Sequence, residues 1–91
     1  MAHYMISYDL HNLRTYKPVW DKLKSCGAVR LLESLWLLTS NSNAVDLRDA
    51  LKAVIDGDDS IAIIELKAGS FWADLRAKDA GVDWLRKNIL A

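Results

Sequence analysis

The sequence predicts an α+β fold: a ferredoxin-like βαββαβ sandwich over residues 1–67, followed by a helical C-terminal extension over residues 68–91. Three observations predict it. Apolar side chains alternate with a period of two in the strand segments, recur at helical spacing between them, and are separated by turn-forming residues. This order of elements is the split βαβ pattern, in which two helices cover one face of a sheet.

The first strand and the first helix follow directly from spacing. In residues 3–10 the more apolar face of the strand is formed by Tyr4, Ile6, Tyr8 and Leu10. Asp9 therefore lies on the other face, at the end of the strand. The helix that follows has Thr15 as its cap, accommodates Pro18 in its first turn, and ends at Gly27.

An apolar run over residues 29–40 predicts either two short strands or one kinked strand. The polar pair Glu33-Ser34 lies near its middle, where a bend or a tight reversal costs least. Asn43 is then expected to cap the second helix, and Asp46 places a negative charge at its positive end.

The core ends with a turn at residues 56–59 and a strand over residues 60–67 that is apolar on both faces. In the extension, Ser70 is expected to cap a helical segment, Gly81 to break it, and a short last helix with Trp84 to follow. Two tryptophans in so short a segment indicate that the extension packs on the same domain or on its dimer partner.

One sheet face is expected to remain open, because both core helices cover the other one. The open face would carry Met5, Leu32 or Leu38, and one side of the last strand. Such a face in water would be a large apolar patch, and a 91-residue domain buries only a modest share of its surface by itself. We therefore expect a homodimer.

Composition and charge exclude several classes of function. Twelve basic and twelve acidic residues give a formal net charge of zero, so no overall field attracts a polyanion. The sequence has no glycine-rich phosphate loop, no zinc-ligand spacing and no nucleophile motif. The single cysteine, Cys26, is expected to be a small buried residue and suits a reducing compartment. With no membrane-length apolar run and no signal-peptide layout, we expect a cytoplasmic protein without a membrane partner.

Asp9 is the main candidate for chemistry. An acid at a strand end is held rigidly from behind and open in front, and it needs a backbone N–H, a cation or a metal as partner. A structural explanation is about as strong: Asp9 caps the next turn through the N–H of His11 or Asn12. Ser7, Ser34 and His11 show no spacing that supports a nucleophile and its base.

A magnesium site would require more than one carboxylate, since Mg²⁺ prefers octahedral oxygen coordination. If two copies of Asp9 faced each other across a dimer axis, they could hold Mg²⁺, or equally Mn²⁺, and activate water against a phosphodiester. His11, Asn12, Arg14 and Lys17 would then lie where phosphates arrive. Taken singly, Arg14 and Lys17 are also explained as solvated charges at a helix start.

Several segments together resemble the CRISPR-associated Cas2 family, whose fold the VapD-type toxins share. The resemblance covers residues 3–67 and rests on Tyr8-Asp9-Leu10, Arg14, Glu33-Ser34-Leu35-Trp36 and Asp58-Asp59-Ser60-Ile61. It implies a ferredoxin-like homodimer that binds nucleic acid, with Asp9 as the catalytic metal-binding acid of a magnesium-dependent endonuclease acting on RNA or DNA. It also implies that the Ser34 region lies near the dimer interface.

The sequence departs from the family pattern in two places. Trp36 stands where the family usually has Phe, and it keeps an aromatic anchor that is expected to be buried or at the interface. Residues 70–90 are predicted to be helical where family members often add a strand that docks an integrase. We therefore do not expect an integrase partner. The alternative function is a non-catalytic dimeric adaptor for nucleic acid or a protein, which the zero net charge favours.

Overall fold

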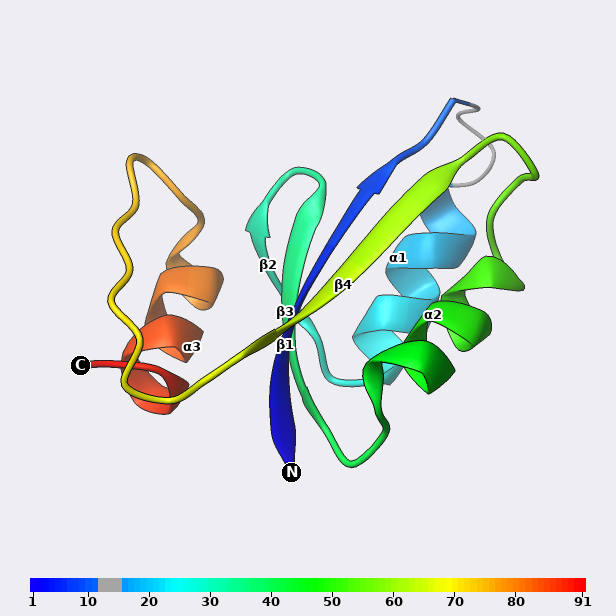
Figure 1. Ribbon diagram of the computed structural model, residues 1–91. Helices are drawn as coiled ribbons and strands as arrows, with labels where there is room; N and C mark the ends of the chain where they lie inside the picture. Colours follow the sequence, from blue (N-terminus) through cyan, green and yellow to red (C-terminus); the bar gives the residue numbers. More distant parts are fainter. Residues whose placement is uncertain (12–15) are drawn as a thin grey trace.

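The computed structural model describes residues 1–11 and 16–91. Its elements follow in the order β1 (Ala2–Asp9), α1 (Tyr16–Ser25), β2 (Val29–Leu32), β3 (Leu35–Ser40), α2 (Ala44–Lys52), β4 (Ser60–Leu66) and α3 (Asp79–Asn88). The strands form one sheet in the order β2-β3-β1-β4, and every neighbouring pair is antiparallel (Figure 1). The predicted α+β, ferredoxin-like core is confirmed.

Helices α1 and α2 cover one face of the sheet and enclose the main core. Residues of β1 alternate between the two faces of the sheet, as predicted. Tyr4, Ile6 and Tyr8 therefore point into this core and are at most 3% exposed. Val19 and Leu23 of α1 and Leu47 and Leu51 of α2 pack against them. Leu38 belongs to this core as well, so the expectation that it might lie on the open face is wrong.

Local signals for the core elements agree with the structure wherever residues are described. Glu33-Ser34 forms a two-residue turn, so residues 29–40 are two strands of a hairpin. The side chain of Asn43 accepts a hydrogen bond of 2.8 Å from the N–H of Asp46, as predicted for a helix cap. Gly27 has a φ of 84°, which ends α1 at low steric cost.

Of two expectations at the ends of the first helix, one is wrong and the other falls outside the described residues. Cys26 is exposed, not buried, because it falls in the turn that follows α1. The cap expected at Thr15 lies outside the described residues.

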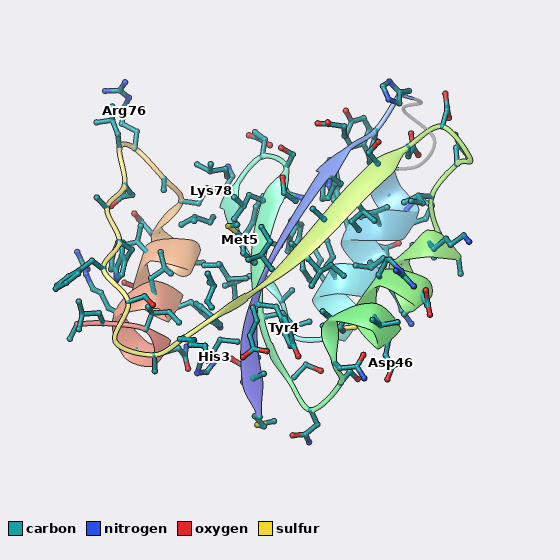
Figure 2. The ribbon with its side chains drawn as sticks, viewed as in Figure 1. His3, Tyr4, Met5, Asp46, Arg76 and Lys78 are labelled. Atoms are coloured by element: carbon teal, nitrogen blue, oxygen red, sulfur yellow. The ribbon has the colours of Figure 1, made fainter. Side chains whose placement is uncertain are left out.

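The second sheet face is partly covered by the chain itself, which corrects the expectation that it stays open. Helix α3 lies over β2 and β3, where Leu85 and Ile89 pack around the buried Leu37 (Figure 1). The N–H of Lys78 donates 2.9 Å to the carbonyl of Leu31, which attaches the extension to the edge strand β2; Figure 2 shows Lys78 beside that strand.

The helix expected after Ser70 is not formed, and Gly81 does not break a helix. Residues 67–78 connect β4 to α3 without regular structure. The indole of Trp72 donates 2.9 Å to the carbonyl of Leu90, so this connection runs along the end of α3 instead of forming a helix. Gly81 lies inside α3 because a Cβ there would be 2.6 Å from the Cα of Leu31. Its missing side chain allows the close approach that sequence spacing cannot reveal.

In the parts of the chain that the structure describes, no helix is both long enough and apolar enough to span a bilayer.

Candidate functional site at the end of the first strand

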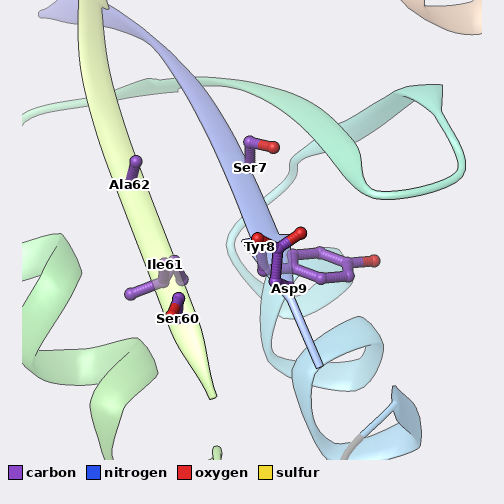
Figure 3. Close-up of a pocket in the computed structure, with 6 residues that line it drawn as sticks. All are labelled: Ser7, Tyr8, Asp9, Ser60, Ile61 and Ala62. Atoms are coloured by element: carbon purple, nitrogen blue, oxygen red, sulfur yellow. The ribbon is translucent and has the colours of Figure 1, made fainter. Parts of the chain in front are cut away.

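Asp9 is the last residue of β1 and pairs with Ser60, the first residue of β4. Its side chain is exposed and lies on the face opposite α1 and α2, as the alternation predicted. Among the described residues, no hydrogen bond or ion pair engages its carboxylate. Figure 3 shows Asp9 at the strand end beside Ser60 and Ile61. The acid is therefore held by the sheet and open to a ligand.

Two surface pockets adjoin this carboxylate. One of about 160 Å³ is lined by residues of β1 and β4, namely Ser7, Tyr8, Asp9, Ser60, Ile61 and Ala62 (Figure 3). The other, of about 360 Å³, is lined by Tyr8, Asp9, Leu10, His11, Tyr16 and Ser34. Asp9 thus lies between two hollows with mixed polar and apolar walls, where a ligand can reach it from either side.

At His11, the backbone after Asp9 is held by Asp59, in the turn before β4, and not by Asp9 itself. The N–H of His11 donates 2.8 Å to Oδ1 of Asp59, in the turn before β4. Oδ2 of the same carboxylate accepts a 2.9 Å hydrogen bond from the N–H of Asp56. His11 was one of two donors expected to satisfy Asp9, so that half of the capping explanation is wrong. The other donor, Asn12, is outside the described residues.

Behind Asp9, the side chain of Tyr8 joins three elements. Its hydroxyl accepts hydrogen bonds from the indole N–H groups of Trp20 at 2.8 Å and Trp36 at 3.0 Å, and donates 3.2 Å to the carbonyl of Glu33. The backbone N–H of Tyr8 also donates 3.2 Å to the carbonyl of Ser34. The end of β1 is therefore tied to α1, to β3 and to the hairpin turn.

Arg30 lies between the same two indoles. Its guanidinium carbon is 4.4 Å from the ring centroid of Trp20 and 4.6 Å from that of Trp36, which is within cation–π distance of both rings. Its Nε is buried and has no hydrogen-bond partner among the described residues. Glu33 approaches one terminal nitrogen at 3.7 Å. The stacking places a positive charge at the base of the hairpin.

The remaining predicted site residues are distributed unevenly around Asp9. His11 and Ser34 line the larger pocket with it. Lys17 is exposed, but its ammonium forms an ion pair of 2.6 Å with Asp21 on the same helix. Trp36, expected to be buried or at an interface, is 2% exposed and lies in the core, so it reaches no surface of the chain. Asn12 and Arg14 lie outside the described residues.

The described residues of one chain do not form a magnesium site by themselves. Among the described residues, no group of three or more His, Cys, Asp or Glu side chains is placed to hold a metal. A lone carboxylate supplies only a small part of the octahedral shell of Mg²⁺ and leaves the rest to water, so the metal would be bound weakly. A metal at Asp9 would therefore need ligands beyond those that the described residues of one chain bring together.

Sequence reasoning missed Asp59 and Arg30. The sequence places Asp59 in a turn and in the motif before the last strand, but it does not reveal that His11, 48 residues away, donates to its carboxylate. Arg30 carried a signal that could have been used: an arginine inside an apolar strand segment needs a partner for its charge. Nothing in the spacing, however, indicates that two tryptophans supply it.

Two comparisons bear on this fold and site. The sequence pattern of the family described as CRISPR associated protein Cas2 matches residues 1–73, which include the whole βαββαβ core and leave α3 outside. Among solved structures, the crystal structure of a hypothetical protein TT1823 from Thermus thermophilus is similar, with a TM-score of 0.67 and 19% sequence identity. The alignment covers 85% of this chain and 94% of that one. At this identity the likeness concerns the fold alone.

Proposed function

The chain belongs to the CRISPR-associated Cas2 family, and from this premise we propose that it is a nucleic-acid-binding homodimer that hydrolyses phosphodiester bonds with a divalent metal. The observation that carries the proposal is the state of Asp9. It is a rigidly held, exposed carboxylate with no partner among the described residues, and it lies between two pockets. Carboxylates in this situation are typical metal ligands and proton acceptors.

Two features support a homodimer as part of this proposal: the ligands that a metal at Asp9 would need, and the uncovered part of the sheet. Helix α3 covers β2 and β3, and Met5 of β1 packs against the cluster that it forms with them. The rest of the same face on β1 and β4 carries Ser7, Asp9, Ser60, Ala62 and Ile64. Ile64, which pairs with Met5 at one end of this area, is 51% exposed. A second copy packed here would bury Ala62 and Ile64 and bring a second Asp9 toward the first, which would supply a ligand beyond those that the described residues of one chain bring together. Mg²⁺ or Mn²⁺ would be held between the two acids.

Binding of RNA or DNA is proposed to depend on local contacts. The net charge of zero provides no long-range attraction for nucleic acid. Cationic side chains and aromatic rings near Asp9 must therefore bind the RNA or DNA strand. His11 and Tyr16 line the larger pocket and offer planar groups for stacking. Arg14 and Lys17 are proposed to contact phosphate, and Lys17 would exchange its exposed partner Asp21 at a cost of less than about 1 kcal/mol.

The test compares cleavage by the wild-type protein and the Asp9→Asn variant. Single-stranded RNA and duplex DNA are incubated with each protein in Mg²⁺, in Mn²⁺ and in chelator. We expect metal-dependent cleavage that Asp9→Asn lowers by roughly 100-fold or more, since such a ligand contributes several kcal/mol to the transition state. Asp58→Asn is the matched control because Asp58 is an exposed acid in the turn before β4. Equal cleavage by wild type and Asp9→Asn would remove Asp9 from the reaction.

A non-catalytic dimeric adaptor is the second candidate. It is favoured by the zero net charge and by the missing metal-ligand group in the described part of one chain. It predicts that the wild-type protein binds nucleic acid or a protein partner with the same affinity in metal and in chelator, and that neither form cleaves. Metal-dependent cleavage that is lost in Asp9→Asn excludes this candidate.

A further inference from the structure

We propose that Asp59 is a positioning residue for Asp9: its carboxylate fastens the backbone that leaves β1 to the turn that enters β4. The inference rests on the proposed function in taking Asp9 as the reactive acid. It adds a residue that acts on Asp9 through the backbone N–H of His11.

The geometry places this contact immediately beyond the last pair of the strand ladder. Asp9 pairs with Ser60, and no pair of β1 and β4 follows it. Asp59 directly precedes Ser60. Its carboxylate accepts a hydrogen bond from the N–H of His11, which lies two residues after Asp9. In Figure 1 the end of β1 and the turn before β4 lie at the same end of the sheet. The hydrogen bond therefore closes the ladder at the point where strand ends otherwise fray.

The carboxylate is itself held in place by its own turn. Oδ2 accepts the N–H of Asp56 at 2.9 Å, and the N–H of Asp59 donates 3.1 Å to the carbonyl of Asp56. Oδ1 is left directed at His11, at 2.8 Å. Both N–H groups donate to an ionised acceptor, which makes these hydrogen bonds shorter and stronger than neutral ones. The carboxylate thus serves the two donors with a separate oxygen for each.

A site built on two copies of Asp9 is sensitive to this contact. Each acid must keep its position at a sheet end while the loop after it lines the larger pocket through His11. A displacement of about 1 Å at a reacting group can cost roughly 100-fold in rate. Rigid attachment of the strand end on the β4 side complements the Tyr8 hydroxyl, which holds it from the α1 side.

Asp59→Asn is the discriminating substitution. It keeps size and shape but has one acceptor oxygen, so its NH₂ group must face one of the two backbone donors. Asp58→Asn removes the same charge from the neighbouring exposed position and is the matched control. Should Asp59→Asn fail to fold, Asp59→Ser serves instead, because its single hydroxyl reaches at most one of the two donors.

The first readout is spectroscopic and does not depend on activity. In Asp59→Asn we expect the NMR signals of the His11 amide and the Asp9 carboxyl carbon to shift, and His11 amide exchange to accelerate by roughly tenfold or more, in a protein that stays folded. Asp58→Asn should match the wild type. Wild-type signals for Asp9 in Asp59→Asn, or the same changes in Asp58→Asn, would overturn the inference.

The second readout is the split between kcat and KM in the cleavage assay. We expect Asp59→Asn to lower kcat by roughly tenfold and to change KM less, because the acid takes part in the chemical step whereas His11 is one of several groups that line the binding pocket. An unchanged kcat would overturn the positioning role. Failure of the proposed function looks different: Asp9→Asn then cleaves as well as the wild type, and the spectroscopic readout alone decides whether Asp59 positions Asp9.

Discussion

The indole N–H of Trp36 donates a 3.0 Å hydrogen bond to the hydroxyl of Tyr8, the residue that directly precedes Asp9. Trp20 donates to the same hydroxyl at 2.8 Å, and Arg30 stacks between the two indoles. An aromatic residue expected to be buried or to anchor an interface is thus a buried support of the candidate acid. A phenylalanine at this position would fill space but could not donate.

Trp36→Phe is expected to destabilise the chain by roughly 2 kcal/mol, because it removes a buried hydrogen bond and part of a packed ring. Urea unfolding followed by circular dichroism measures the loss. Trp84→Phe is the control: Trp84 is partly buried and contacts His3 edge to face at 5.4 Å, without a hydrogen bond from its indole to the described residues. Equal losses in the two variants would show that the Tyr8 contact contributes nothing of its own.

Arg30→Lys tests the stacked guanidinium. A compact ammonium cannot lie flat between two rings, so we expect a loss of about 1 kcal/mol in the free energy of unfolding although the charge is kept. Arg48→Lys, at an arginine of α2 whose side chain is 56% exposed, should stay within about 0.5 kcal/mol of the wild type. A neutral Arg30→Lys would mean that the two indoles hold each other without the cation.

Gly81→Ala tests the contact between α3 and β2. The added Cβ would lie 2.6 Å from the Cα of Leu31 and 2.8 Å from the carbonyl oxygen of Arg30, both backbone atoms that cannot rotate away. We expect a net loss of about 1–3 kcal/mol from overpacking, even though alanine favours helix by about 1 kcal/mol.

Gly57→Ala is the control for that substitution, since a Cβ there would meet nothing within 4 Å. Thermal unfolding of both variants measures the difference. A Gly81→Ala protein as stable as the wild type would show that α3 can move away from β2 at no cost.

Ile64→Lys tests where a second copy binds. Ile64 is 51% exposed on the part of the sheet that α3 leaves uncovered, so a buried lysine there should raise the dimer dissociation constant roughly 30-fold or more. Val45→Lys is the control, because Val45 is 53% exposed on α2, on the other side of the sheet. Sedimentation velocity distinguishes dimer from monomer. A dimer that survives Ile64→Lys unchanged would place the interface elsewhere.

The sequence by itself determined which residues of β1 form the core and where on the strand Asp9 lies. A period of two in β1 decides that Tyr4, Ile6 and Tyr8 are buried and that Asp9 is not, since successive strand residues point to opposite faces. The cap at Asn43 and the reversal at Glu33-Ser34 also follow from contacts between near neighbours. These features depend on local geometry, which spacing encodes.

Only the tertiary structure decided what surrounds the acid. The carboxylate of Asp59 accepts a hydrogen bond from the N–H of His11, 48 residues away in sequence. The backbone of Leu31 packs closely against Gly81, which is possible because Gly81 has no side chain. Such contacts join segments brought together by folding, and they depend on distances of a few tenths of an ångström between atoms that no local pattern relates. For the same reason the sequence indicated that one sheet face needed a cover, while the fold determined that α3 provides half of it.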